Sequence, residues 1–499
     1  MRCYRHIKHT TLLLCFFYVM LVCGAGGAET EKTGPVDMSF SGTMPLNDCV
    51  VFAVANSFEV KLAKLDLYIA ETGLMYSEAA FDTFLSGGYS YSEDRRKRIS
   101  SALSRYDYIG SYHAAMEKTL PTGTDVSIKF EDRRARLETD YAGIGFYHVP
   151  ELTFNVEQPV GKNAFGFINR SGITLTALAI ENAGLSEQDR IEALIAKVEK
   201  AYWNAVFQKR ALEIYENILG KAKKLHDVNE KNYDIGIMEK VDFVASRANL
   251  SKREAEVIVA GNRYRRAEEN LKLVMNMDED LRVTPRGKLK LEHLKEDLAD
   301  CLKISFGNRR DYKIAKRDIE ITGLNVKVKS NSRWPEIDFV ATAALNGLDA
   351  DIQKAAREIP GADNPYYYVG VEFEIPIENK EAESEYLAAK LEKQKALIEI
   401  KDVERTIITE VGNSFRDVLT FESGLKYIRD AVVFQSEKLA EEEKRFNYGR
   451  STTKNIIDYQ QDLLRTELEE AQYLLDHSVA RVDLERDMNV ILAKYKDEL

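Results

Sequence analysis

A long tract without proline is the feature of this sequence that most constrains its fold. No proline follows Pro376, so nothing in this tract forces a helix to break. Apolar residues recur there at steps of three and four, as they do along one face of an α-helix. These residues are Ile400, Val403, Ile407, Val411, Phe415, Val418, Leu425, Ile428, Val432 and Leu439, and the pattern resumes after a break near Gly449. We therefore predict a helical hairpin over residues 378–493.

A hairpin of this length is too extended for the core of one globular domain. At about 1.5 Å per residue, a first arm of roughly 70 residues would reach about 100 Å. Gly449 suits a left-handed helix end, and Ser451 or Thr452 suits the start of the return helix. Such a hairpin is either a coiled-coil rod or a wall segment of a tubular structure, and this tract alone favours neither.

The N-terminus has the pattern of a secretory signal peptide. Arg2, Arg5 and Lys8 precede an apolar segment over residues 12–22, and small residues follow. We predict cleavage after Ala28, which removes three positive charges and no negative ones and moves the net charge from −11 to −14 (−11 − 3). Cys23 leaves lipidation open as an alternative, although Val22 is bulky for the position before a lipidated cysteine. The acidic balance makes nucleic acid a poor partner.

Two cysteines remain after the predicted cleavage, Cys49 and Cys301, and they are far apart in the sequence. Two buried thiols are therefore expected rather than a disulfide. The last four residues, Lys-Asp-Glu-Leu, match a luminal retention signal, and Asn169 and Asn249 begin glycosylation sequons. A retained luminal protein thus stays open as a third interpretation.

Comparison of the sequence with itself predicts two copies of one unit. Leu46-Asn-Asp-Cys49 matches Leu298-Ala-Asp-Cys301, and the turn that ends at Gly236 matches the one that ends at Gly449. The first copy, residues 29–287, is predicted to hold a helix, strands near 81–92 and 151–160 around an insert over 93–150, and a helical hairpin over 186–280. The second copy, residues 288–499, is predicted to hold a helix, strands near 336–345 and 366–377, and the hairpin over 378–493.

The predicted strands alternate between apolar and polar residues. In residues 366–377, Val369, Val371 and Phe373 face one side, whereas Glu372 and Glu374 face the other. Strands of roughly ten residues with this alternation fit a membrane barrel with a wet interior, and a half-buried soluble sheet gives the same pattern. The insert has strand-like tracts that would extend a hairpin beyond the membrane, and its basic residues are interpreted as solvated loop charge.

The number of predicted strands leads to an argument about assembly. After the signal peptide no stretch of 18 apolar residues exists, so no transmembrane helix is expected. Two strands per copy give four per chain, whereas membrane barrels begin at about eight strands and an open edge is not tolerated in lipid. Several chains must then pool their strands, and three chains would give twelve.

The sequence contains no recognisable set of catalytic residues. The seven histidines are scattered, without a His-x-x-x-His or Cys-x-x-Cys pair. The sequence has neither a Gly-x-x-x-x-Gly-Lys phosphate loop nor a Gly-x-Ser-x-Gly elbow. We therefore predict no catalytic residues, no metal site and no cofactor, and expect that any transport is powered by another subunit.

Several weak motifs in a duplicated order carry a family resemblance. They are the two Leu-x-Asp-Cys helix starts, Gln158-Pro159, Ile375-Pro376, Glu199-Lys-Ala-Tyr-Trp203, Tyr233-Asp-Ile-Gly236 and Arg445-Phe-Asn-Tyr-Gly449. With them, roughly residues 44–492 resemble the TolC-like outer membrane efflux proteins, the exit ducts of tripartite efflux and type I secretion systems.

The resemblance implies a mainly α fold with a β part. It implies a homotrimer with a twelve-stranded barrel in the outer membrane and a long helical barrel in the periplasm. It also implies passive conduction, with a periplasmic adaptor (membrane fusion) protein and an inner-membrane transporter as partners. Neither the cargo, the particular pump nor the gating residues follow from it, and the role of the insert stays open.

Candidate site residues follow from the alternation and from the resemblance. Glu157, Glu372 and Glu374 would line the pore, on the polar strand faces. The turns about Gly236 and Gly449 resemble the segments that meet the adaptor, although both glycines would cap helices in any case. Asp242 and Asn455 lie just past these turns, and because Asn455 is not a carboxylate, no acidic ring is assigned. The alternative function is a periplasmic coiled-coil adaptor or scaffold of an export complex.

Overall fold

The computed structural model describes residues 42–94, 96, 106–138, 145–278, 280–281, 283–496 and 498. The predicted signal peptide with Cys23, parts of the insert over 93–150, and two of the last four residues lie outside this part. Gly42–Leu499 form one compact unit, which is described here by itself.

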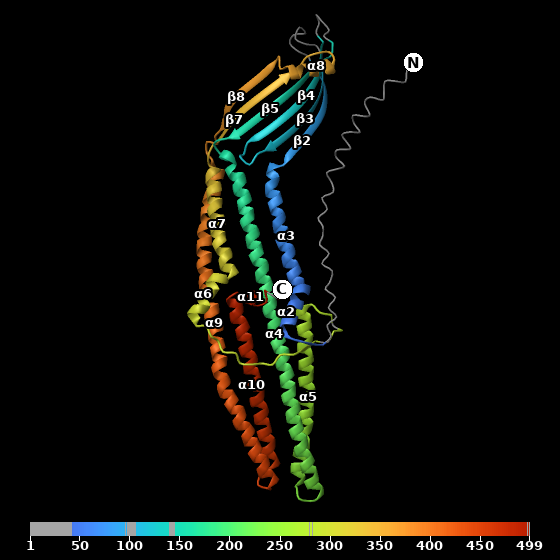
Figure 1. Ribbon diagram of the computed structural model, residues 1–499, viewed down its shortest axis with the longest axis vertical. Coiled ribbons are helices and arrows are strands. Elements are labelled where there is room, and N and C mark those ends of the chain that lie inside the picture. Colours follow the sequence, from blue (N-terminus) through green and yellow to red (C-terminus); the bar gives the residue numbers. More distant parts are fainter. Residues whose placement is uncertain are drawn as a thin grey trace, which may run out of the picture. The chain divides into compact units, whose positions relative to one another are not determined.

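A six-stranded antiparallel sheet forms one end of this unit (Figure 1). Its order is β2-β3-β4-β5-β7-β8, so each strand pairs with the next one along the chain in the sheet. The strands are β2 (Thr83–Asp94), β3 (Tyr106–Thr119), β4 (Asp125–Glu138), β5 (Tyr147–Pro159), β7 (Glu336–Asn346) and β8 (Pro365–Glu374). Strands of 10 to 14 residues are long for a soluble sheet and match the roughly ten-residue strands of membrane walls.

The prediction of four strands per chain is wrong, because the insert supplies two more. Residues of the tract over 93–150 form β3 and β4, which pair with each other and fill the space between β2 and β5. The basic residue Arg133 is part of this pairing, opposite Ser111 on one side and Val149 on the other. A charged side chain is compatible with a strand when one face of the sheet meets water, so the interpretation as loop charge fails here.

Four helices continue from the sheet. They are α3 (Phe58–Glu78), α4 (Phe167–Asp234), α7 (Arg310–Asn331) and α9 (Lys380–Asn447). Both α4 and α9 have 68 residues, which at about 1.5 Å per residue gives about 100 Å. The first helical hairpin was expected to begin near residue 186, but α4 begins at Phe167, close behind the strand that ends at Pro159.

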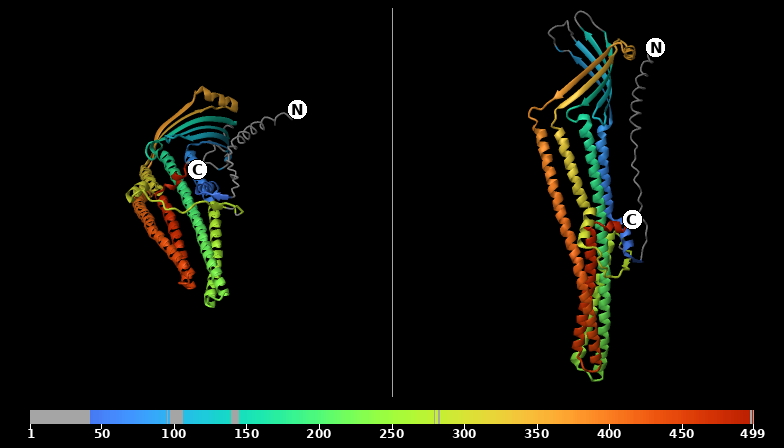
Figure 2. Two further views of the ribbon diagram at one scale, coloured as in Figure 1. Left: turned by 60° about the horizontal axis from the view of Figure 1, so that its bottom comes forward. Right: turned by 60° about the vertical axis from the view of Figure 1, so that its left-hand side comes forward.

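Two return helices complete the helical hairpins, α5 (Lys240–Met275) and α10 (Thr453–Asp487). Near the sheet the contacts give the helix order α3-α4-α7-α9, and beyond the middle they give α5-α4-α10-α9. Figures 1 and 2 show the same single layer of parallel and antiparallel helices from several sides. Four helices therefore lie abreast along most of the layer.

Short elements fill the middle of the layer and the outer loop of the sheet. In the middle lie α2 (Leu46–Asn56), α6 (Leu298–Asn308), α11 (Ile491–Lys494) and the parallel pair β1 (Gly42–Met44) and β6 (Val283–Pro285). The loop between β7 and β8 holds α8 (Ile352–Glu358), and short 3₁₀ turns cover Ala79–Phe81, Ala164–Gly166 and Ile359–Gly361.

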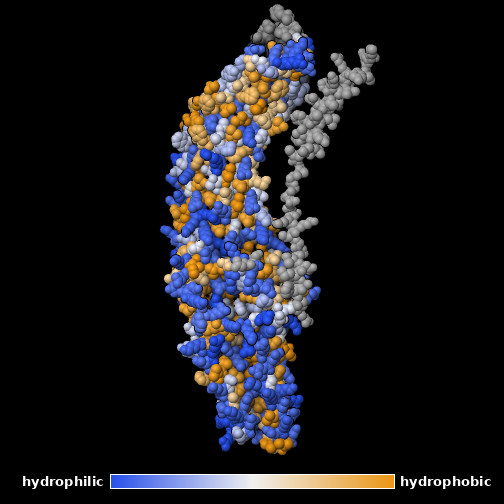
Figure 3. Space-filling model, in the orientation of Figure 1, coloured by the Kyte–Doolittle hydropathy of each residue, from blue (hydrophilic) through white to orange (hydrophobic). Residues whose placement is uncertain are grey.

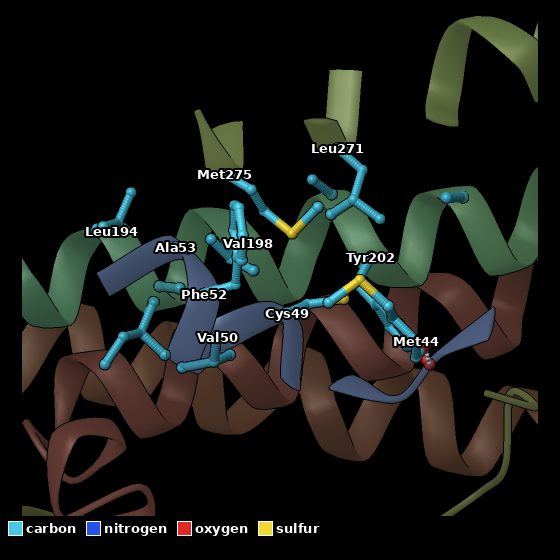
Figure 4. Close-up of a cluster of buried hydrophobic side chains, with 14 of the residues drawn as sticks. Met44, Cys49, Val50, Phe52, Ala53, Leu194, Val198, Tyr202, Leu271 and Met275 are labelled. Carbon is cyan, nitrogen blue, oxygen red and sulfur yellow. Dashed lines mark hydrogen bonds between the residues drawn. The ribbon is translucent and has the colours of Figure 1, made fainter. Parts of the chain in front are cut away.

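A large cluster of buried hydrophobic side chains surrounds α2. Figure 4 shows Cys49, Val50 and Phe52 of α2 against Val198 of α4 and Met275 of α5. Each fully buried side chain of this size contributes about 1.5–3 kcal/mol relative to exposure. Cys49 and Cys301 are both buried and free, which confirms the expectation of two buried thiols.

Charged groups in this core are buried as pairs. Glu192 of α4, which is fully buried, accepts hydrogen bonds from the Arg310 guanidinium and from the backbone N–H of Ile491, the latter at 2.9 Å. Glu199, about two turns further along α4, accepts a hydrogen bond from the Tyr495 hydroxyl at 2.5 Å. These bonds join α4 to the second half of the chain and fix the position of α11.

Candidate functional site

The register of the strands sorts the sheet residues into two faces, because residues directly opposite each other on paired strands share a face. One face, here called the apolar face, contains almost only apolar side chains over its central height. Its members are Leu85, Tyr89, Tyr91, Tyr112, Ala114, Met116, Val126, Ile128, Phe130, Leu152, Phe154, Val156, Ile337, Phe339, Ala341, Ala343, Leu345, Tyr367, Val369, Val371 and Phe373.

No element in the described part of the chain covers the apolar face. Leu85 is 71% exposed and Phe373 74% exposed, at opposite edges of the sheet. Figure 3 shows hydrophobic residues gathering over the sheet, above a helical part that is mostly hydrophilic on the side in view. A patch of this extent is larger than soluble monomers usually expose and indicates contact with lipid or with another protein.

The opposite face, here called the polar face, collects carboxylates near the helices. Glu157 lies opposite Asp125, and Asp338 lies opposite Glu372. Glu336 and Glu374 form a further pair, one step closer to the helices. The three predicted pore residues, Glu157, Glu372 and Glu374, thus share one face of the sheet. Sequence reasoning missed the other three carboxylates, although each follows the same alternation.

Neither edge of the unit has a partner among the described residues of the chain. The outer strands β2 and β8 each pair on one side only, and nearly all their residues are exposed. The helices that continue these edges, α3 and α9, carry exposed apolar side chains at helical spacing. On α3 they are Phe58, Leu62, Leu65, Ile69 and Tyr76, and on α9 they are Leu387, Leu391, Ile398 and Ile408. The exposed edges of the sheet and of the helical layer therefore lie on the same sides.

The two helical turns have the same hydrogen-bond geometry. Gly236 and Gly449 adopt left-handed φ angles of 78° and 70°. Gly236 N–H donates to Tyr233 and Gly449 N–H to Phe446, at 2.9 and 2.8 Å. In each turn the next residue donates back to the carbonyl five positions earlier, which completes a Schellman motif. Capping therefore explains both glycines, and contact with an adaptor stays a prediction.

Asp242 and Asn455 lie in the first turns of the two return helices. Asp242 is on α5, where a carboxylate is favourable because it faces the positive end of the helix dipole. The backbone N–H of Asn455 donates to the Thr452 hydroxyl, which caps α10, at 3.4 Å. The Asn455 side chain donates instead to Glu442. Each residue thus has a local structural role.

Exposed apolar residues at the turns were missed by the sequence analysis. Ile235, Ile237 and Val241 in the first turn are 67%, 76% and 75% exposed, and Tyr448 in the second is 79% exposed. The available signal was β-branched residues within a turn, where polar residues are the rule. Such side chains at the end of a helical hairpin indicate a docking surface.

Buried polar groups connect the two hairpins near the turns. The Asn229 side-chain amide of α4 donates to the Thr453 hydroxyl of α10 at 3.1 Å, and both side chains are buried. Close by, Glu442 accepts from the Ser451 hydroxyl at 2.6 Å. This hydrogen bond, aided by the charge of Arg445, lowers the pKa of Glu442.

The glycosylation sequons lie within helices. Asn249 is only 6% exposed on α5, so a glycan there would require α5 to leave its neighbours. Asn169 accepts a hydrogen bond from Asn163 at 2.8 Å in the first turn of α4. The interpretation as a glycosylated luminal protein has no support at either position.

Other kinds of site were sought in the described part of the chain. No three His, Cys, Asp or Glu side chains there are placed to hold a metal ion. Among the described helices, none combines the length and the apolarity needed to cross a bilayer.

Searches against protein-family models and against curated proteins find no match to this chain. Solved structures, however, match over most of its length. A CusC structure, described as undergoing conformational changes on folding and transmembrane channel formation, has a TM-score of 0.66 at 12% identity and covers 89% of this chain and 91% of its own.

Two further matches are outer membrane channels. The Campylobacter jejuni CmeC outer membrane channel gives a TM-score of 0.64 at 14% identity, over 91% of this chain and 89% of its own. The open state of the Neisseria gonorrhoeae MtrE outer membrane channel gives 0.64 at 15% identity, over 89% and 88%. The chain therefore has the fold of these outer membrane channels, and the predicted mainly α fold with a sheet part is confirmed.

Proposed function

We propose that this chain, which has the fold of TolC-like outer membrane channels, is itself an outer-membrane channel of an efflux or type I secretion system. The main support is the sheet, whose six strands share one face that is almost entirely apolar over its central height and one face rich in carboxylates. In lipid, an apolar outer face and a polar inner face are what a water-filled barrel needs. The helical layer would extend the same conduit into the periplasm.

Three copies would close the wall. Unpaired backbone groups at a lipid-exposed sheet edge are too costly to persist, so β2 and β8 need partners. Because β2 and β8 are the two outer strands of an even-numbered antiparallel sheet, β8 of one copy pairs antiparallel with β2 of the next. The exposed apolar residues of α3 and α9 on the same two sides, such as Leu62 and Leu391, would then pack together. The number three follows the resemblance to the efflux proteins.

Flow through the channel is passive in this proposal. The turns with the exposed Ile235, Ile237 and Tyr448 would dock on a periplasmic adaptor, and an inner-membrane transporter would supply the energy. Glu157, Glu372 and Glu374 would line the pore near the inner side of the membrane and favour cations over anions, because unscreened carboxylates close together attract positive charge.

Membrane extraction and conductance test the proposal. A channel stays in the membrane pellet after washing with high salt and dissolves only in detergent, whereas a periplasmic adaptor or scaffold without membrane strands is released by salt. The detergent-purified protein should have the mass of three chains and open ion-conducting steps in a planar bilayer. Material that is monomeric without detergent and gives no conductance would contradict the proposal.

Selectivity separates the pore face from the lipid face. The double substitution Glu157→Gln with Glu372→Gln should reduce the preference for cations, measured as a shift in reversal potential under a salt gradient. Val156→Thr, on the apolar face beside Glu157, is the matched control and should leave the reversal potential unchanged. If the two changes shifted the reversal potential equally, Glu157 and Glu372 would not line the pore.

A further inference from the structure

The β3–β4 hairpin distinguishes this sheet from the four strands that the sequence predicts. Its turn, over Leu120–Asp125, is tight, with Gly123 N–H donating to Leu120 at 2.7 Å and Leu120 N–H donating to Thr124 at 2.8 Å. The turn is at the same end of the sheet as the helices, because β4 begins at Asp125 opposite Glu157, near the end of β5. The hairpin therefore spans the sheet from its outer end to the start of the helices.

The turn is fitted against the start of α4. Gly123 and Gly166 both have left-handed φ angles, and a Cβ placed on Gly123 would lie 2.7 Å from the backbone nitrogen of Gly166. The Gln158 side chain also bonds this turn, donating from Nε2 to the Thr122 carbonyl at 3.2 Å. A loose extension of the sheet would not need this close backbone approach, so the hairpin is a fixed part of the junction between sheet and helices.

From Val126 to Phe130 of β4, and over the paired part of β3, the side chains of the hairpin follow the two faces of the sheet; beyond Phe130 the apolar face carries Asp132 and Arg134. Ile128 of β4 lies opposite Phe154 of β5 and opposite Met116 of β3, all on the apolar face. The next residue, Ser127, lies opposite Asn155 and Glu117 on the polar face. The hairpin thus has the same pattern as β5, one of the strands that the sequence assigns to the membrane wall.

The width of the sheet matches the width of the helical layer only when the hairpin is counted. Strands about 4.8 Å apart and tilted by about 40° each occupy about 6.3 Å around a barrel. Six strands then span about 38 Å and four span about 25 Å. Four helices abreast, at about 8–10 Å each, span about 32–40 Å. Figure 1 shows the strands running obliquely to the helices, as this estimate requires.

We propose that the β3–β4 hairpin crosses the membrane as part of the channel wall, so that each copy supplies six strands. This rests on the proposed function and its three copies, which then form an eighteen-stranded barrel. A barrel of 16–18 strands encloses an aqueous channel, whereas smaller barrels are increasingly filled by side chains. The sheet would then be about as wide as the ring of helices below it, and the outer membrane section would not be the narrowest part of the conduit.

Spin labels at paired positions test where the hairpin lies. Single cysteines at Ile128 and Ser127 on β4 are labelled with a nitroxide, and Phe154 and Asn155 on β5 provide the matched reference. The protein is reconstituted in phospholipid vesicles, and collisions of each label with oxygen, which partitions into lipid, are compared with collisions with a water-soluble nickel chelate. The parent chain, in which Cys49 and Cys301 are buried, gives the background.

The outcomes separate this inference from the proposed function. We expect Ile128→Cys and Phe154→Cys to favour oxygen, and Ser127→Cys and Asn155→Cys to favour the nickel chelate, each by several-fold. If the β5 pair alternates but both β4 labels favour the chelate, the hairpin lies outside the membrane and this inference fails alone. If neither pair alternates, the membrane wall itself is absent and the proposed function fails with it.

A charge substitution gives an independent check. Ile128→Arg would put a charge into lipid, at a cost of about 2–4 kcal/mol near the bilayer centre. It should reduce the amount of trimer extracted from the outer membrane several-fold, whereas Ser127→Arg should leave that amount unchanged. If both variants gave equal yields, β4 would not be part of the membrane wall. This test does not depend on spin labelling, so it holds even if one label fails to attach.

Discussion

Apolar and charged residues have opposite surroundings in the sheet and in the core around α2. In the core, Cys49 and Ile195 are fully buried, and Glu192 has its charge matched by Arg310. In the sheet, Val371 and Phe373 are more than 60% exposed, and the carboxylates of the polar face lie beside other carboxylates. The core buries its apolar side chains and pairs its charges within the chain, whereas the sheet leaves its apolar face exposed and gathers like charges on its polar face.

This difference separates what one chain provides from what its surroundings must provide. Burial of the core around α2 holds the helices in register with nothing further present. The sheet, in contrast, has an exposed apolar face and two unpaired outer strands, and in the proposed channel lipid, water and the strands of neighbouring copies would satisfy them. Substitutions in the core should therefore act on the stability of each chain, and substitutions in the sheet on membrane assembly.

The largest effect is expected at the buried pair of the core. Glu192→Ala leaves Arg310 charged and unpaired in a buried position, which should lower the free energy of unfolding by about 3–5 kcal/mol. Urea unfolding in detergent, followed by far-ultraviolet circular dichroism, measures this change. Glu216→Ala, at an exposed position of the same helix, is the control and should change stability little. If both substitutions lowered the free energy of unfolding equally, the Glu192–Arg310 pair would not stabilise the core.

A somewhat smaller effect is expected in the sheet, and of a different kind. Phe154→Arg on the apolar face should cost about 2–4 kcal/mol of membrane insertion, whereas Asn155→Arg on the polar face should cost little. The amount of the protein that detergent extracts from the outer membrane fraction measures this difference. Both variants should keep the unfolding behaviour of the helical part, because neither touches the core. If Phe154→Arg, and not Asn155→Arg, lowered the stability of the helical part, the sheet and the core would not be independent of each other.

The same division explains why the sequence assigned β7 and β8 to the membrane wall but placed the strand-like tracts of β3 and β4 beyond it. In β7 and β8 the alternation is clean, since Phe339 and Val371 lie on the apolar face and Asp338 and Glu372 on the polar one. In β3 and β4 the apolar run is short, and Arg133 and Arg134 follow it within the strand. A charged end resembles a loop when the sequence is considered alone, and only the pairing with β5 identifies it as the outer part of a strand.

The start of α4 was missed for a different physical reason. Its contact with α3 includes Thr176 packed near Gly73 and hydrogen-bonded to Ser77 at 2.7 Å. The apolar residues of this stretch also fall on two sides of the helix, with Ile173 and Ile180 on one side and Leu175 and Leu178 on the other, so a periodicity search finds no single stripe. The turns at Gly236 and Gly449 were predictable because only glycine adopts their left-handed φ without cost, whereas the Asn229–Thr453 hydrogen bond joins residues far apart in the sequence.

A smaller, pH-dependent effect is expected within the helical layer. Burial, aided by the nearby positive charge of Arg481, lowers the pKa of His477 below its ordinary value of 6.5. Glu422 and Glu292 act in the opposite direction, and His293 weakly in the same one. The folded chain therefore binds this proton less readily than the unfolded chain. The stability that the neutral His477 side chain contributes to the folded state is fully present above pH 6.5. It is lost as the pH falls from there through the lowered pKa.

Substitution isolates the contribution of His477. In His477→Leu, the loss of stability between pH 7 and pH 5 should be smaller than in the parent chain. Ser436→Leu, a non-titratable change at an exposed position of α9, is the control and should keep the parent's pH dependence. Urea midpoints at several pH values measure both. An unchanged slope in His477→Leu would assign the acid sensitivity to other groups.

The smallest perturbation uses the core cysteine as a reporter and leaves the chain unchanged. Burial, together with the charge of Asp48, raises the pKa of the Cys49 thiol to about 12. At pH 8 only about one thiol in ten thousand would then be a thiolate, which is the reactive form. Iodoacetamide should therefore leave Cys49 unmodified in the folded protein and modify it fully in urea, as peptide mass spectrometry can measure. A cysteine introduced at Ser127 serves as the reactive control, because it lies on the polar face of the sheet, which would meet water in the proposed channel. If Cys49 reacted as fast as this control in the folded protein, the core would open without help from the membrane, and the chain would not hold its helices together by itself.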